Sequence, residues 1–135
     1  MLFRSGQRIT YTINSFKIIQ NNPLFGVGTG DFPSEYEKVY VKNMSDAGLT
    51  VNPHNMYILT TVQLGVLGLA SMLLIFYHQL KFALSSKVGI VKDLGVVLPM
   101  LFLVIMWSDS YLLGHYTTIL FVFFSSFLYK DFEKN

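Results

Sequence analysis

The sequence predicts an all-α integral membrane protein with three transmembrane helices, preceded by an outer segment that consists of a helix and a loop. Hydrophobic residues make up 52% of the chain and charged residues only 13%. The mean hydropathy of +0.45 is high for a soluble domain of 135 residues. The apolar residues also occur in long runs rather than in the stripes of a soluble helix, and lysines flank these runs on one side.

The first predicted element is a helix over residues 5–20. Apolar residues recur at helical spacing on two sides of it, with Ile9, Ile13 and Phe16 on one side and Tyr11 and Ile18 on the other. The Asn-Asn-Pro sequence that ends at Pro23 stops the helix. Because two of its faces are apolar, we expect this helix to lie in the membrane interface against the other helices.

A glycine-rich stretch follows, with alternating glycines at Gly26, Gly28 and Gly30. Its G-x-G-x-G spacing lacks the flanking strand and helix of a dinucleotide-binding loop, so a buried turn is the preferred interpretation. Residues 34–51 are predicted to form a polar loop. Tyr36 and Tyr40 in this loop would either stack on a sugar or simply pack.

Three apolar runs predict the spans, at about residues 56–77, 94–109 and 111–129. The first has 22 residues without a charge, which cover about 33 Å as a helix and match a hydrocarbon core of about 30 Å. The chain therefore divides into an outer part, residues 1–55, and a transmembrane part, residues 56–135.

The charges predict the orientation of these spans. Bases cluster in the loop after the first span and in the C-terminal tail, at Lys81, Lys87, Lys92, Lys130 and Lys134. The positive-inside rule places both segments in the cytoplasm, so residues 1–55 and 108–110 are expected to lie on the outer side of the membrane. The scattered bases form no patch that would bind nucleic acid. The chain has no cysteine and no acid or histidine pair at ligand spacing, so no metal site is predicted.

His54 is the main candidate for chemistry. Asn52 as N-cap and Pro53 at the first helical position would place it in the first turn of the first span. The positive helix end disfavours an imidazolium there, so a neutral ring that accepts a proton is expected. Steps of three and four residues lead from His54 along one stripe: Ile58, Thr61, Gly65, Gly68 and Met72. The small residues Thr61, Gly65 and Gly68 would let another helix approach closely. The alternative is that His54 only forms a hydrogen bond at the interface.

Two further residues lie at the outer end of the second and third spans. Asp109 would contact an acceptor, orient a donor, or cap the third helix, and the cap is the preferred interpretation. His115 lies one turn further along the chain. It either faces a substrate vestibule that it would share with Asn55 and Asp109, or belongs to an aromatic belt with Tyr111 and Tyr116.

These residues resemble a family signature. The chain is similar to the O-antigen ligase and polymerase family, whose pattern His-[Asn/Ser/Gln]-x9-Gly-x-x-[Gly/Thr/Tyr] is matched at His54, Asn55, Gly65 and Gly68. A second family feature is an arginine followed by a Pro-Leu-Phe-Gly-Val-Gly-x-Gly-x-Phe stretch, matched by Arg8 and residues 23–32. Members of this family have many more membrane helices. The chain is therefore expected to be the C-terminal part of a longer protein and to be inactive when separated from the rest of it.

The resemblance implies a function. Family members transfer a glycan from undecaprenyl diphosphate to an acceptor hydroxyl on the periplasmic side of the bacterial inner membrane, without a metal, nucleotide sugar or other cofactor. The resemblance implies that His54 deprotonates the acceptor and that Arg8 holds the diphosphate, a role that suits a guanidinium; otherwise Arg8 would only meet lipid headgroups. The acceptor would be lipid A core for a ligase, a growing glycan for a polymerase, or a protein hydroxyl for an oligosaccharyltransferase, and ligase is narrowly preferred. A membrane subunit or transporter fragment is the non-enzymatic alternative.

Overall fold

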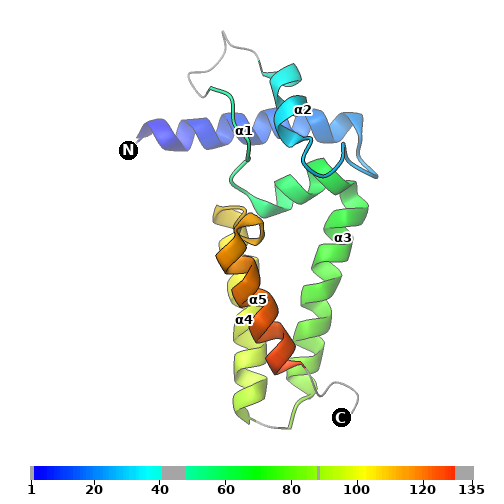
Figure 1. The fold of residues 1–135 in the computed structure, drawn as a ribbon, viewed down its shortest axis with the longest axis vertical. Helices are drawn as coiled ribbons and strands as arrows, with labels where there is room; N and C mark the ends of the chain where they lie inside the picture. The colour runs from blue at the N-terminus through cyan, green and yellow to red at the C-terminus, as the bar shows by residue number, and fades with distance from the viewer. Residues whose placement is uncertain (1, 41–47, 88, 130–135) are drawn as a thin grey trace.

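The computed structural model describes residues 2–40, 48–87 and 89–129, and its elements within these ranges are all helical. In chain order they are α1 (Leu2–Asn21), α2 (Phe32–Val39), α3 (Met56–Ser85), α4 (Gly89–Ser108), the 3-10 turn η1 (Tyr111–Leu113) and α5 (His115–Leu128). Helices α3, α4 and α5 run along the long axis of the molecule, and α1 lies across one end of them with α2 packed against it (Figure 1). The prediction of an all-α fold is confirmed for these residues.

Two of the described helices, α3 and α4, are long and apolar enough to cross a membrane. The third predicted span is also an apolar helix, but α5 has only 14 residues. That length corresponds to about 21 Å, less than the hydrocarbon thickness. It is shorter than expected because η1, rather than the α-helix itself, occupies the beginning of the third apolar run.

Helix α3 differs from the predicted uninterrupted span because its backbone breaks at Gly65, which has φ 68° and ψ −169°. Only glycine adopts this conformation readily. The glycine-rich loop closes the break with four backbone hydrogen bonds. The amides of Val27 and Gly28 donate to the carbonyls of Val62 and Gln63, both at 2.9 Å, while the carbonyls of Pro23 and Leu24 accept from Val66 at 2.8 Å and Leu67 at 3.4 Å. The loop thus replaces helical hydrogen bonds that the break removes.

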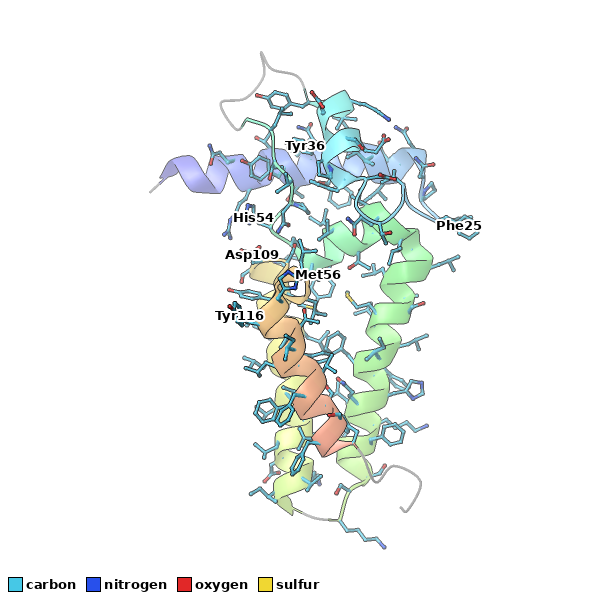
Figure 2. The ribbon with its side chains drawn as sticks, viewed as in Figure 1. Phe25, Tyr36, His54, Met56, Asp109 and Tyr116 are labelled. Atoms are coloured by element: carbon cyan, nitrogen blue, oxygen red, sulfur yellow. The ribbon has the colours of Figure 1, made fainter. Side chains whose placement is uncertain are left out.

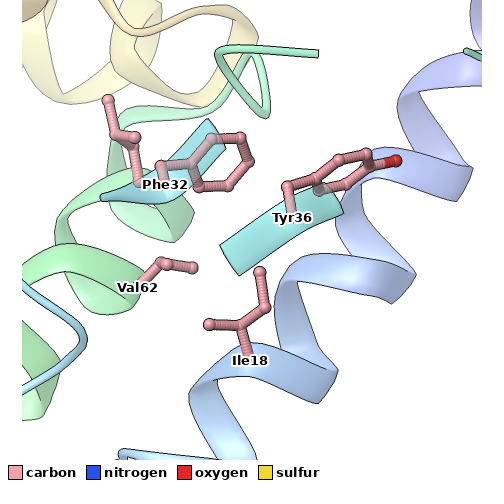
Figure 3. Close-up of a cluster of buried hydrophobic side chains, with 5 residues drawn as sticks. Ile18, Phe32, Tyr36 and Val62 are labelled. Atoms are coloured by element: carbon pink, nitrogen blue, oxygen red, sulfur yellow. The ribbon is translucent and has the colours of Figure 1, made fainter. Parts of the chain in front are cut away.

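The break divides α3 into two parts with different roles. The part before Gly65 lies under α1, and the part after it turns and runs along α4 (Figure 1). A buried apolar cluster joins the first part to α1 and α2 (Figure 3), and its members are Ile18, Phe32, Tyr36, Leu59 and Val62. A second cluster of Phe76, Phe102 and Met106, with Phe121 against it, holds α3, α4 and α5 together.

The prediction of a polar loop over residues 34–51 is wrong for its beginning, because residues up to Val39 belong to α2. Pro33 lies in the first turn of this helix, where a proline is well tolerated. Tyr36 is fully buried and stacks on Phe32, with 5.6 Å between the ring centroids. Its hydroxyl accepts a hydrogen bond from Asn14 of α1 at 3.2 Å, and burial raises its pKa. Tyr36 therefore packs inside the protein and does not present its ring to a sugar. Residues 41–47 of the predicted loop lie outside the described residues.

Candidate functional site

His54 lies just before α3 rather than in its first turn. The N-cap is Asn55, whose extended backbone and side-chain oxygen, 3.1 Å from the amide of Ile58, meet the requirements of a cap. The predicted N-cap, Asn52, instead accepts a hydrogen bond from the amide of His54 at 2.9 Å. The helix therefore begins three residues later than expected for that cap. His54 therefore does not lie in the first helical turn, where the positive end of the helix was expected to disfavour an imidazolium.

The backbone of His54 is strained. Its φ of 55° lies in the left-handed region, and it is the only described residue other than glycine with a positive φ. Such a conformation is uncommon for a residue with a side chain and persists only where neighbours impose it. Here the Asx turn of Asn52 on one side and the buried ring of Pro53 next to it hold the backbone in place.

Three side-chain contacts tie residues 52–55 to the C-terminal end of α4 and the two residues after it. The Nδ1 atom of His54 lies 3.2 Å from Oδ1 of Asp109. The Nδ2 amide of Asn55 donates to the carbonyl of Trp107 at 3.1 Å, and the hydroxyl of Ser110 donates to Oδ1 of Asn52 at 2.7 Å. Segments that are more than fifty residues apart in the sequence thus form one polar junction, at which His54 and Asp109 lie side by side (Figure 2).

The preferred interpretation of Asp109 as a helix cap is wrong. The N-cap of α5 is Gly114, and Ser110 occupies that position for η1. Asp109 accepts instead from the amide of Ser110 at 2.7 Å with the same oxygen that contacts His54. When Nδ1 of His54 carries the ring proton, it donates to this carboxylate, and the lone pair is then on Nε2. In this tautomer the Nε2 lone pair can accept a proton, as a general base must.

Arg8 comes to the same junction from α1. Its Nη1 atom donates to the carbonyl of Ser108 at 3.2 Å. Ser108 is the neighbour of Asp109, so the guanidinium and the imidazole contact adjacent residues at the end of α4. One bond to a carbonyl uses only one of the five N–H donors of the guanidinium, and the side chain is exposed. Arg8 therefore retains donors for an anion.

A groove of about 750 Å³ connects these residues. Its polar end contains Arg8, His54 and Asn55, and Trp107 and Ser108 lie beside them. The rest of the groove is apolar and runs beneath α1, where Ile9, Ile13 and Phe16 are each more than half exposed. The groove thus offers a cationic and titratable end joined to an apolar channel. This shape and chemistry suit an amphiphile with an anionic head.

Thr61, Gly65 and Gly68, the small residues predicted to let another helix approach, each make a different contact. Thr61 lines the groove, and its hydroxyl donates to the carbonyl of Tyr57 within α3. Gly65 faces the backbone of Leu24, not a helix, since a Cβ atom there would lie 2.1 Å from the Leu24 oxygen. A Cβ atom on Gly68 would lie 2.1 Å from Cβ of Leu64, so the close approach at Gly68 is within α3 itself.

His115 begins α5, is exposed, and is not among the described residues that line the groove. Two aromatic residues of the site were not predicted from the sequence. The ring of Tyr11 lies beside that of His54, with 6.1 Å between their centroids, and Trp107 lines the groove. The spacing of the first helix placed Tyr11 on the face opposite Ile9. Nothing in that pattern indicates which face meets the histidine.

Comparison with known proteins points to one family. A family model described as O-antigen ligase matches residues 2–73, just over half of the chain. The matched segment includes α1 with Arg8, the glycine-rich loop, His54 and the break at Gly65. No curated protein matches the chain, and no solved structure does.

Proposed function

Because the chain belongs to the O-antigen ligase family, we propose that it transfers a glycan from undecaprenyl diphosphate to an acceptor hydroxyl, with Arg8 and His54 in the reaction site. The observation that carries this proposal is the shared groove. Residues from α1 and from the segment before α3 line its polar end, and the Asp109 carboxylate contacts the imidazole. A non-catalytic membrane subunit would have no need for this convergence.

His54 is proposed to be the general base. With Nδ1 bonded to Asp109, Nε2 accepts the proton of the acceptor hydroxyl as its oxygen attacks the anomeric carbon of the donor sugar. A new carbon–oxygen bond forms while the bond between the anomeric carbon and the diphosphate oxygen breaks, and the diphosphate leaves with the electron pair. A base and correct positioning of the two substrates are sufficient, because a neutralised diphosphate is a good leaving group.

Arg8 is proposed to bind the diphosphate. Its planar donors match phosphate oxygens in pairs, and its charge stabilises the negative charge that develops on the leaving group. Its bond to the Ser108 carbonyl supports the guanidinium in the groove that His54 also lines, and does not neutralise its charge. The apolar channel beneath α1, lined by Ile9, Ile13 and Phe16, suits the polyprenyl tail of the carrier.

The family and the apolar helices suggest a bacterial membrane protein. We propose that the groove faces the periplasm and that the C-terminus is cytoplasmic, since the lysines at the opposite end of α3 and α4 favour the cytoplasm. We further propose lipid A core as the acceptor, as in a ligase. The growing glycan of a polymerase and a protein hydroxyl would use the same base and the same leaving group.

The test is His54→Ala in the intact protein, with His78→Ala as the matched control. His78 is an exposed histidine of α3 far along the helix from the groove. Purified protein is supplied with a defined undecaprenyl diphosphate-linked glycan and with each acceptor in turn. Loss of transfer by about 100-fold or more in the His54 variant alone, at equal protein level, is expected for a general base. Unchanged transfer by that variant would overturn the proposal and favour a subunit role. The acceptor that is glycosylated identifies the subclass.

A further inference from the structure

The turn at Leu24 and Phe25 exposes two large apolar side chains at the corner where α3 changes direction. Phe25 is 75% exposed and Leu24 is 58% exposed. Figure 2 shows Phe25 pointing outward at this corner, on the side of the molecule away from His54. The proposed chemistry does not use these side chains, and an exposed apolar patch at a loop tip is typical of a site of protein or membrane contact.

Backbone hydrogen bonds attach this turn to the start of the long part of α3. The carbonyl of Leu24 accepts from the amide of Leu67 at 3.4 Å, and the neighbouring Pro23 carbonyl accepts from Val66 at 2.8 Å. Val66 and Leu67 are themselves about half exposed. The apolar surface of the turn is therefore continuous with the apolar surface of a candidate membrane-spanning helix.

The length of α4 helps to set the level of the turn. Helix α4 has 20 residues, which cover about 30 Å, the thickness of the hydrocarbon core. The part of α3 after Gly65 runs along α4 in the opposite direction (Figure 1). The break at Gly65 therefore lies toward the C-terminal end of α4, and backbone hydrogen bonds hold the Leu24–Phe25 turn beside it.

We propose that the Leu24–Phe25 turn is inserted into the lipid bilayer at the boundary between headgroups and acyl chains. Its partner is the acyl-chain surface of the surrounding lipids. Because the same loop closes the break in α3 and follows directly on α1, this contact sets the depth at which α1 and Arg8 lie relative to the membrane surface. This inference depends on membrane insertion of α3 and not on the reaction proposed above.

Spin labelling can test this depth directly, because the described chain contains no cysteine. A nitroxide is attached to Phe25→Cys in the intact protein, with any cysteine outside this sequence replaced by serine, and the protein is reconstituted in phosphatidylcholine vesicles. Leu74→Cys, exposed in the middle of the long part of α3, is the lipid reference. Glu37→Cys, exposed on α2, is the water reference. Leu24→Cys replaces Phe25→Cys if that variant does not fold.

Accessibility to oxygen, which concentrates in lipid, and to a water-soluble nickel chelate distinguishes the possible environments. We expect position 25 to favour oxygen over the chelate, as at position 74, with position 37 showing the reverse order. A higher accessibility to the chelate than to oxygen at position 25 would place the turn in water and overturn the inference. Low accessibility to both reagents would mean that polypeptide covers the turn, and this too would overturn it.

Discussion

Asp109 and His54 are 55 positions apart in the sequence, yet Oδ1 of the carboxylate lies 3.2 Å from Nδ1 of the imidazole. Each side chain is 38% exposed, so the pair is partly accessible to solvent and not sealed in the core. As a surface ion pair it would add little stability. We propose that its importance lies in orientation, because Nδ1 faces Asp109 and Nε2 is then the ring nitrogen left for a substrate.

Replacing the Asp109 carboxylate tests this orientation. Asp109→Asn keeps the shape of the side chain but lets its amide present a donor to Nδ1, which favours the tautomer with the proton on Nε2. We expect glycan transfer to fall by about 10- to 100-fold, part of the contribution of a general base, with little change in the KM for the donor. Steady-state kinetics in reconstituted vesicles measure this. Asp93→Asn, an exposed acid near the other end of α4, should have no effect. Equal activities of the Asp109 variant and the unmodified protein would refute an orienting role.

The guanidinium of Arg8 is expected to act as a paired donor and not only as a positive charge. Arg8→Lys keeps the charge but removes the planar fork. The KM for the lipid-linked donor should rise by about tenfold, since a charge-assisted hydrogen bond contributes about 1.5–3 kcal/mol. Lys17→Gln removes an exposed charge from the same helix and serves as control. A donor KM that is the same in Arg8→Lys and Lys17→Gln would contradict the proposed diphosphate contact.

Gly65 is expected to tolerate no side chain. In Gly65→Ala a Cβ atom would lie 2.1 Å from the Leu24 oxygen, and φ of 68° disfavours alanine independently. We predict a loss of at least about 2 kcal/mol in the free energy of unfolding, measured by denaturation in detergent. Gly6→Ala in α1 meets nothing within 4 Å and should be neutral or slightly stabilising. Similar stability of the two variants would show that the loop does not dock on α3 as described.

Tyr36 should stabilise the packing of α2 on α1 and α3 mainly by its ring. Tyr36→Phe removes only the hydroxyl and leaves the Asn14 amide without its acceptor, for a cost of about 1–3 kcal/mol. Tyr36→Ala also empties the centre of the buried cluster, at a cost of about 3–5 kcal/mol. Limited proteolysis of α1 and α2 at increasing denaturant concentration compares the two variants. Thr29→Ala, at an exposed loop position, is the control. An equal loss in both Tyr36 variants would mean that the hydrogen bond, and not packing, holds α2.

The extents of two helices were well predicted, because short stretches of sequence decide them. The first helix was expected over residues 5–20 and occupies Leu2–Asn21, because Asn-Asn-Pro stops a helix whatever surrounds it. The second apolar run, expected over residues 94–109, lies within α4 and the residue after it. Its length and hydropathy need no tertiary information. The break at Gly65 was not predicted. A single glycine costs a helix only about 1 kcal/mol, so the apolar run around it still predicts one continuous span.

The sequence by itself therefore determined that the chain is helical, that it contains apolar helices of membrane length, and that Arg8 and His54 belong to a recognisable family pattern. Only the tertiary structure decided that Asn55 caps α3, that the glycine-rich loop completes the helix at Gly65, and that Asp109 contacts His54. The reason is that hydropathy and helix propensity act over a few neighbouring residues. The partners of a hydrogen-bonding group depend on which distant segments packing brings within about 3 Å of it.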